Sequence, residues 1–222
     1  MSRIIAYSDG AYSGKAKDGG FGIFITETDS RVPTVDAEVL TIIGGKTTCD
    51  TTGNRMEMAS LIASILLVKD YLESNEIETK EVDIYSDSEY SVKAFNEWHH
   101  NWKKNGWKAS SGKPVKNLEL VKFGLKMIED AKTKFKLRII HTPGHAGLPG
   151  NEVVDDLAIT YRLKKIKNDD QMYEEMVSIA NRYGFKVKYD HLLEIGYSTI
   201  HNESFLDSSN IEELFENSFL TF

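Results

Sequence analysis

A chain of 222 residues that is 41% hydrophobic and 27% charged has an ordinary globular composition, with room for one substantial domain or for one domain and an appendage. It has no apolar run of about 18 residues and no secretory signal in its first residues, MSRIIAYS, so we expect no membrane association. The single cysteine, Cys49, cannot form an internal disulfide. We therefore expect a protein of the reducing cytoplasm.

The net charge of −7 at pH 7 is unevenly distributed along the chain. Residues 166–222 carry four basic and eleven acidic side chains, whereas residues 1–165 carry equal numbers of the two. Binding partners respond to local patches of charge rather than to the total. The acidic total therefore does not exclude a nucleic-acid partner.

The apolar pattern of residues 1–165 predicts alternating strands and helices. We expect strands at residues 3–9, 20–28, 37–47, 81–86 and 136–141. We expect helices at residues 54–72, about 87–98, about 115–131 and 151 to about 165. The pair Gly44 and Gly45 indicates a bulge or bend in the third strand. Three strands followed by alternating helices and strands predict an α/β fold, in which helices flank a mixed sheet.

The pattern weakens beyond residue 165. A short amphipathic helix is expected at 170–183 and a strand at 185–189, FKVKY. We assign residues 1–165 to one domain and 166–222 to an acidic C-terminal extension. Its last segment, roughly fifteen residues that end in LFENSFLTF, has two interpretations. It is either a disordered, solubilising tail or a peptide whose hydrophobic side chains bind a replication protein, such as a sliding clamp or a single-strand-binding protein.

Four carboxylates, Asp9, Glu57, Asp87 and Asp155, lie where strands end or helices begin, the positions at which open α/β sheets carry their sites. Each also has a purely structural explanation. Asp9 fits an Asp-Gly turn, Glu57 a capping box with Asn54, Asp87 a helix N-cap and Asp155 a solvated helical position. If the four converge, their repulsion requires protons or a cation, and oxygen ligands suit Mg²⁺ or Mn²⁺. Spacing alone leaves open whether they meet.

The segments YSDGAYSG, TTGNRMEM, YSDSEY, NWKKNGWK and GHAGLPGNEVVDDLA occur in the order and approximate separation of the ribonuclease H family, type 1, the bacterial kind. The chain resembles that family over residues 1 to about 165. The resemblance implies a ribonuclease H-like fold with a five-stranded mixed sheet. It also implies a hydrolase, an endonuclease that cleaves the RNA strand of RNA–DNA hybrids by two-metal-ion catalysis, leaving 3′-hydroxyl and 5′-phosphate ends. Two Mg²⁺ ions per site are expected, with Mn²⁺ as a substitute, and the enzyme is expected to be a monomer.

The resemblance assigns a role to each candidate catalytic residue. Asp9 resembles the aspartate that bridges both metals, and Glu57 and Asp87 resemble ligands of the second metal. Glu57 is also similar to the residue that lies near the RNA 2′-hydroxyl. Asp155, in NExxD, matches the acid that completes the shell of the first metal. His145, in GHAG, resembles a histidine that assists proton transfer or product departure, a role that suits an imidazole. The alternative for His145 is an ordinary surface histidine.

A basic segment interleaves tryptophans with lysines. Residues 93–116 contain six lysines and one acid, together with all three tryptophans of the chain. One interpretation is a helix with its indole rings facing the core and its lysines solvated; the other is a basic protrusion that binds phosphates. The segment resembles the family's protrusion, which binds the DNA strand of the hybrid. The contact residues assigned there are Trp102, Lys103, Lys104, Trp107 and Lys108.

Further contacts to the hybrid are implied by the resemblance near the carboxylates. Gly10 and Ala11 are assigned to the RNA strand, and Thr52 and Asn54 to the DNA strand. Gly53 and Glu89 depart from the polar or amide side chains that are frequent in the family. Two rival functions stay open: another nuclease of the same fold, such as a junction resolvase, and a non-catalytic module that binds hybrids.

Overall fold

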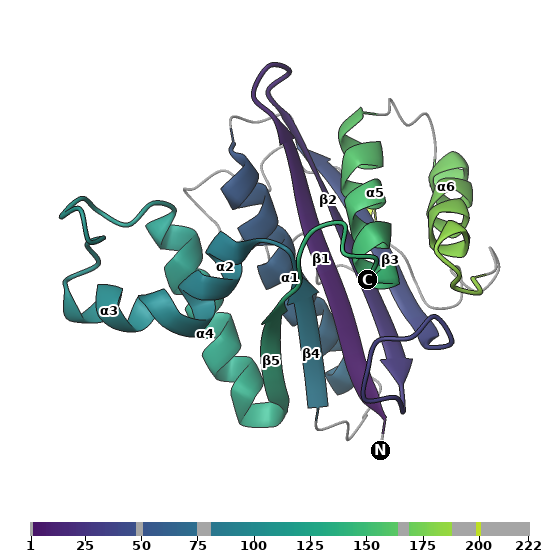
Figure 1. The fold of residues 1–222 in the computed structure, drawn as a ribbon, viewed down its shortest axis with the longest axis horizontal. Coiled ribbons are helices and arrows are strands. Elements are labelled where there is room, and N and C mark those ends of the chain that lie inside the picture. Colours follow the sequence, from purple (N-terminus) through teal and green to yellow (C-terminus); the bar gives the residue numbers. More distant parts are fainter. Residues whose placement is uncertain (1, 48–50, 75–80, 164–168, 188–198, 201–222) are drawn as a thin grey trace.

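The computed structural model describes residues 2–47, 51–74, 81–163, 169–187 and 199–200. Its centre is a mixed sheet with the strand order β5–β4–β1–β2–β3–β6 (Figure 1). The strands are β1 (Arg3–Ser13), β2 (Asp18–Thr28), β3 (Glu38–Thr47), β4 (Glu81–Ser86), β5 (Lys136–His141) and β6 (Thr199–Ile200). β1 to β3 form an antiparallel meander, and β4 and β5 run parallel to β1. The expected five-stranded mixed sheet is confirmed, and the two-residue β6 extends it beside β3.

Helices cover both faces of this sheet. They are α1 (Gly53–Ser74), α2 (Glu89–Lys93), α3 (His99–Lys104), α4 (Leu118–Lys134), α5 (Pro149–Leu163) and α6 (Asp169–Arg182). A π-helical turn, Ala94–Trp98, joins α2 to α3. Side chains alternate along β1, so that Ile4 and Ala6 pack with α1 and α4, whereas Ile5 and Tyr7 pack with α5 and α6 (Figure 1). Burial on both faces explains why β1 begins as a continuous apolar run.

The first hairpin is longer than the sequence pattern predicts. The pattern assigns residues 10–19 to a connection between two strands, but β1 continues to Ser13 and β2 begins at Asp18, and these two residues pair. The remaining turn is closed by a 2.7 Å hydrogen bond from the amide of Lys17 to the carbonyl of Ser13. Asp9 is therefore inside a strand, and the interpretation of Asp9 as a strand-ending turn residue is wrong.

Two further local predictions are corrected by the structure. Gly44 lies in regular register opposite Gly22, and the register shift between β2 and β3 falls at Ile25/Thr26 instead. Gly44 provides room rather than a bend, because a Cβ there would overlap the ring of Tyr161. The strand expected at 185–189 does not form over residues 185–187. The side-chain amide of Asn181 hydrogen-bonds both the amide (2.9 Å) and the carbonyl (3.1 Å) of Val187, so these groups need no neighbouring strand.

Other expectations concern residues that the structure does not describe. Cys49 and the C-terminal segment expected to be either a disordered tail or a partner-binding peptide lie outside the described residues. In the described part of the chain, no helix is both long enough and apolar enough to span a bilayer.

Candidate active site

The site is centred on Asp9, which is 7% exposed to solvent and lies opposite Gly22 of β2 in the sheet. Two helices approach this point closely. A Cβ at Gly22 would lie 2.5 Å from a backbone carbonyl oxygen of α5, and a Cβ at Gly10 would lie 2.4 Å from the backbone nitrogen of Glu57 in α1. Both separations are shorter than any real side chain tolerates. Glycine at these two positions therefore lets the helices that carry Glu57 and Asp155 close on Asp9.

Glu57 extends from the start of α1 toward the β4–α2 junction. The N-terminus of α1 is capped by Thr52, whose side-chain oxygen accepts a 3.3 Å hydrogen bond from the amide of Arg55. The carboxylate of Glu57 accepts a 2.5 Å hydrogen bond from the hydroxyl of Ser88. The capping-box interpretation of Glu57 is therefore wrong, because Thr52 caps the helix and the Glu57 carboxylate faces Ser88.

Asp87 lies directly after β4 and close to the loop that follows β5. The alternative interpretation made Asp87 a helix N-cap, but Ser88 caps α2 instead. The side chain of Ser88 accepts a 3.2 Å hydrogen bond from the amide of Ser91. The Asp87 side chain lies close to Gly144 of that loop, since a Cβ at Gly144 would be 3.1 Å from a carboxylate oxygen of Asp87. The carbonyl of Asp87 is also 3.3 Å from Nε2 of His141. The side chain of Asp87 therefore does not cap the helix, and it borders the loop that carries His145.

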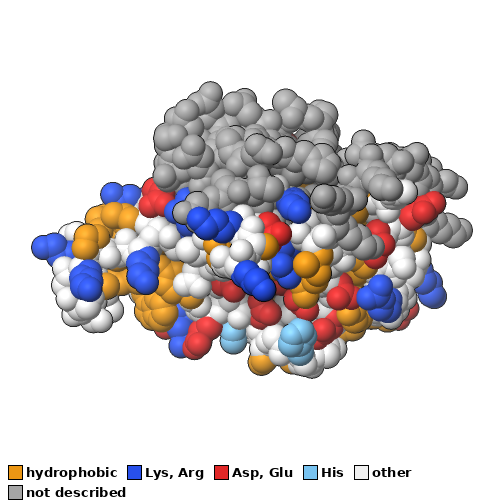
Figure 2. Space-filling view, turned by 90° about the horizontal axis from the view of Figure 1, so that it is seen from above, with side chains coloured by type: hydrophobic (Ala, Val, Ile, Leu, Met, Phe, Trp, Pro, Cys, Tyr) orange, Lys and Arg blue, Asp and Glu red, His pale blue; other side chains and the backbone are white. Residues whose placement is uncertain are grey.

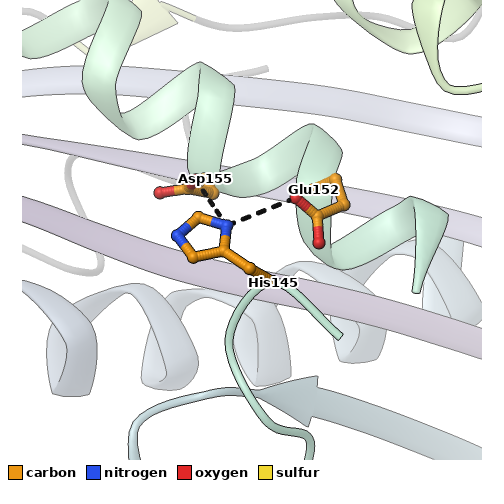
Figure 3. Close-up of side chains that lie close together, drawn as sticks. All are labelled: His145, Glu152 and Asp155. Carbon is orange, nitrogen blue, oxygen red and sulfur yellow. Dashed lines mark hydrogen bonds and ion pairs between the residues drawn. The ribbon is translucent and has the colours of Figure 1, made fainter. Parts of the chain in front are cut away.

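His145 points from this loop toward two carboxylates of α5 (Figure 3). Its Nδ1 is 3.5 Å from Glu152 and 3.8 Å from Asp155, and the ligand atoms of the three residues lie within 4.8 Å of one another. The imidazole is 78% exposed. His145 has a φ of 52°, in the left-handed region that non-glycine residues seldom adopt, and Gly147 follows with a φ of 78°. The loop therefore turns sharply at these residues, and such backbone strain is common at functional sites.

The electrostatics show that the predicted carboxylates influence one another. Burial, and then the charge of Asp87, raise the pKa of Asp9 to about 8, with smaller contributions from Asp155 and Glu57. Burial also raises the pKa values of Glu57 and Asp155, and in both the charge of Asp87 adds to the effect. Carboxyl groups of this kind hold protons unless a positive charge is supplied. The four acids that the sequence singled out therefore lie close enough for their charges to act on one another.

Glu152 was missed by the sequence analysis. Its side chain is 17% exposed, and besides contacting His145 it accepts a 3.4 Å hydrogen bond from the amide of Gly147. The hydrogen bond to Glu152, followed by the charge of Asp155, raises the pKa of His145. A signal was present in the sequence, since Glu152 and Asp155 are three residues apart and so share one face of a helix.

Comparison with known proteins identifies the family. The sequence model of RNase H matches residues 1–162. The Ribonuclease H of Brucella anthropi is 38% identical over 158 residues, which cover 71% of this chain and 88% of that protein. The Ribonuclease H of Rhizobium etli is 37% identical over 158 residues, covering 71% of this chain and 90% of that protein. The chain belongs to the ribonuclease H family. The resemblance to a bacterial-type ribonuclease H enzyme is thereby confirmed.

Solved structures of ribonucleases H share the fold. The crystal structure of LC9-RNase H1, a type 1 RNase H with the type 2 active-site motif, has a TM-score of 0.54 and 22% identity, covering 84% of this chain and 86% of that chain. The solution structure of the PFV RNase H domain has a TM-score of 0.52 and 20% identity, covering 72% of this chain and 93% of that chain. At these identities the likeness confirms the ribonuclease H-like fold.

The basic segment of this ribonuclease H, residues 93–116, forms a lobe that comprises the end of α2, the π-helical turn, α3 and the chain that follows α3. Figure 2 shows basic and hydrophobic side chains together on the end of the molecule where α3 lies in Figure 1. Trp98 and Trp102 lie with ring centroids 5.8 Å apart, and the ammonium group of Lys122 is 5.2 Å from the centre of the Trp107 ring. All three tryptophans pack partly buried against the main core. The first interpretation is thus correct in that the rings face the core, although Trp107 lies beyond the end of α3.

The lysines of this lobe differ in their surroundings. Lys103, Lys104 and Lys108 are exposed, but Lys103 lies 3.2 Å from the carboxylate of Glu129 and is partly neutralised. Glu89, which stands where an amide is frequent in the family, forms a 2.5 Å ion pair with Lys93 one helical turn away. The positive charge available to a polyanion therefore comes mainly from the other exposed lysines of the segment, Lys104, Lys108, Lys113 and Lys116.

The remaining predicted contacts lie around the carboxylates. Thr52 and Asn54 are exposed at the start of α1, whereas Gly10 and Ala11 are partly exposed on β1. Gly53, which departs from the family pattern, has no atom of the described residues within 4 Å of the position that a Cβ would occupy. A larger residue at position 53 would therefore meet open space, and the departure removes a side chain without disturbing the backbone.

Proposed function

We propose that this enzyme hydrolyses the RNA strand of RNA–DNA hybrids and that Asp9, Glu57, Asp87 and Asp155 hold two divalent cations. The observation that carries the proposal is the raised pKa of Asp9. Burial of its carboxyl group, together with the charges of three further acids, raises its pKa to about 8. Ionised carboxylates in this arrangement destabilise the folded protein, and a bound cation would remove that destabilisation.

The donor set fits hard cations. The four residues offer carboxylate oxygens, the ligand type that Mg²⁺ and Mn²⁺ prefer. Divalent ions held there would stabilise the charge that develops on the phosphodiester and activate water for attack. The 3′-hydroxyl and 5′-phosphate products are part of the same proposal. By the resemblance to the family, Asp9 would help to hold both ions, Glu57 and Asp87 the second ion, and Asp155 the first.

His145 is suited to moving a proton at the edge of this site. Glu152 contacts its Nδ1, which leaves Nε2 free to exchange protons with water or a departing oxygen. The exposure of the ring lets it reach a substrate that lies above the carboxylates. In this role His145 would assist the reaction without being needed to hold the cations.

Hybrid recognition is proposed for two surfaces on either side of the acids. Only the 2′-hydroxyl distinguishes RNA from DNA in the sugar, so Glu57 and the backbone of Gly10 and Ala11 are the candidates for sensing the RNA strand. The DNA strand would lie across Thr52 and Asn54 toward the basic lobe of Trp102, Lys103, Lys104, Trp107 and Lys108.

The decisive experiment compares substrates. With Mg²⁺, end-labelled RNA–DNA hybrid should be cleaved in its RNA strand, whereas duplex RNA, duplex DNA and branched DNA should remain intact. Cleavage of branched DNA instead would indicate a junction resolvase. Tight binding of the hybrid without cleavage, at any concentration of Mg²⁺ or Mn²⁺, would indicate a non-catalytic module.

We expect His145→Ala to lower kcat roughly 100-fold, as the loss of a proton-transfer group typically does. Its affinity for Mn²⁺, measured on the protein without substrate, should stay within about twofold of wild type, because the proposed ligands are untouched. His100→Ala is the control, since it removes an exposed histidine of α3, and it should keep most of the rate. A large loss of Mn²⁺ affinity in His145→Ala would show that the histidine is a ligand.

We expect Lys104→Ala and Lys108→Ala to weaken hybrid binding more than Lys103→Ala, because Lys103 already pairs with Glu129. Each effective lysine should lower the slope of log affinity against log salt by about one. Binding titrations by fluorescence anisotropy at several salt concentrations measure this slope. Lys134→Ala, which removes a lysine paired with Glu73, is the control. Equal slopes for all four variants would contradict the assignment of the lobe.

A further inference from the structure

Residues 169–187 lie beyond the segment that matches the RNase H family, yet they are part of the core. The inward face of α6 consists of five side chains at helical spacing, each at most 2% exposed: Met172, Tyr173, Met176, Ile179 and Ala180. They belong to the same buried cluster as side chains of β1, β2 and α5. α6 is thus packed beside α5 (Figure 1), as firmly buried as the elements of the family domain.

The residues that follow α6 are also fixed by hydrogen bonds. Gly184 has a φ of 95°, and the amides of Gly184 and Phe185 donate to the carbonyls of Asn181 (3.1 Å) and Ala180 (3.2 Å). This pair of hydrogen bonds forms a Schellman motif, which ends the helix in a defined turn. Asn181 then secures Val187 through both backbone groups. The two residues at the end of the helix, Arg182 and Tyr183, are therefore held in place from both sides.

Arg182 and Tyr183 converge on one carboxylate of α5. The guanidinium of Arg182 lies 2.8 Å and the hydroxyl of Tyr183 lies 2.7 Å from the same oxygen of Asp156. Burial, followed by the hydrogen bond to Asp156, raises the pKa of Tyr183 to about 12, and the charge of Glu152 contributes. The hydroxyl is therefore a donor at neutral pH. A carboxylate that accepts two such bonds, one of them charge-assisted, has a restricted orientation.

The position of Asp156 connects this contact to the active site. It directly follows Asp155, one of the four proposed cation ligands, and it is one helical turn beyond Glu152, which contacts His145. We propose that Arg182 and Tyr183 are positioning residues of the active site, which act through Asp156 to hold the first turns of α5 against the site. This inference rests on the proposed function and adds residues from outside the family domain to the catalytic arrangement.

The test uses the full chain with Arg182→Gln/Tyr183→Phe. Displacing Asp155 by a fraction of an ångström should lower kcat about tenfold while KM for the hybrid changes less than about twofold, because hybrid binding depends on other surfaces. The Kd for Mn²⁺, measured by electron paramagnetic resonance on protein without substrate, should rise at least about threefold. Arg162→Gln is the matched control, since it removes an arginine of α5 that also pairs with an aspartate, Asp18, but lies further along the helix from the site. That control should keep the wild-type kcat and Kd.

The outcomes separate a positioning role from a merely structural one. A lower melting temperature with kcat and Mn²⁺ affinity within about twofold of wild type would overturn the proposal. Should the double variant not fold, Tyr183→Phe alone, which removes one hydroxyl, carries the same test with a smaller expected loss of about threefold in kcat. If wild-type protein does not cleave the hybrid, the proposed function fails, and the Mn²⁺ comparison still decides whether Arg182 and Tyr183 organise the acids.

Discussion

Asp9→Asn should abolish cleavage of the hybrid and, in the absence of divalent cations, make the protein more stable at pH 8. Both effects have one physical cause. Asp9 is buried among three other acids, so its ionised form is unfavourable until a cation is bound. Asparagine keeps the shape of the side chain but cannot ionise and is a poor ligand for Mg²⁺. We expect kcat to fall by at least about 1,000-fold, the scale on which a central electrostatic group contributes.

The sign of the stability change follows from the pKa of Asp9. It is raised from an ordinary 3.8 to about 8 in the folded protein. Between these values the folded state holds a proton that the unfolded state has lost, so the free energy of unfolding falls as pH rises from about 4 to about 8. An asparagine side chain does not titrate, so the substitution removes that loss. Allowing for relaxation around the site, we expect Asp9→Asn to be about 2 kcal/mol more stable at pH 8, or roughly 4–8 °C in melting temperature.

Thermal unfolding with a chelator, at pH 5 and pH 8, measures this difference. The gain from Asp9→Asn should be small at pH 5 and large at pH 8. Asp130→Asn is the control of opposite sign, because the hydrogen bond from Lys69 lowers the pKa of Asp130 and its ionised form is the favoured one. Adding Mg²⁺ should raise the melting temperature of wild type but not of Asp9→Asn. Equal stability of the two proteins at both pH values would contradict a charged cluster around Asp9.

The sequence was informative where local chemistry and long-range geometry agree. The five strands were predictable because each is an apolar run bounded by polar residues, and the four acids because each lies in a recognisable motif. Their individual alternatives were decided only by tertiary contacts. Glu57 is directed to Ser88, a residue from a different element 31 positions away in the sequence, and no local rule predicts that pairing.

The features that were missed depend on contacts between distant segments. Alternating side chains at 185–189 indicate a strand. In the structure, the side-chain amide of Asn181 hydrogen-bonds the backbone of Val187, in the place that a neighbouring strand would take. The pairing of Ser13 with Asp18 lengthens the first hairpin through polar residues that carry little strand signal. The bond between Tyr183 and Asp156 joins a loosely patterned segment to the helix that carries Asp155.

Gly10→Ala should both destabilise the fold and impair catalysis, because β1 and the start of α1 are in close contact at this position. A Cβ at Gly10 would lie 2.4 Å from the backbone nitrogen of Glu57 and 2.4 Å from the carbonyl carbon of Met56. Both neighbours are backbone atoms, which cannot turn aside as a side chain could. Accommodating one methyl group therefore requires β1 and α1 to separate by about 1 Å, at a cost of about 3 kcal/mol.

The same displacement would separate Glu57 from Asp9, so we expect Gly10→Ala to lose about 100-fold in kcat even at temperatures where it is folded. Gly53→Ala is the matched control: it adds the same methyl group to the same helix, where no atom in the described part of the chain lies within 4 Å, and alanine favours the helix slightly. Its melting temperature and kcat should equal or exceed those of wild type. Circular dichroism and hybrid cleavage measured on both variants decide the matter. A wild-type rate in Gly10→Ala would mean that the acids do not depend on this close contact, since any folded form of that variant must hold the strand and the helix further apart.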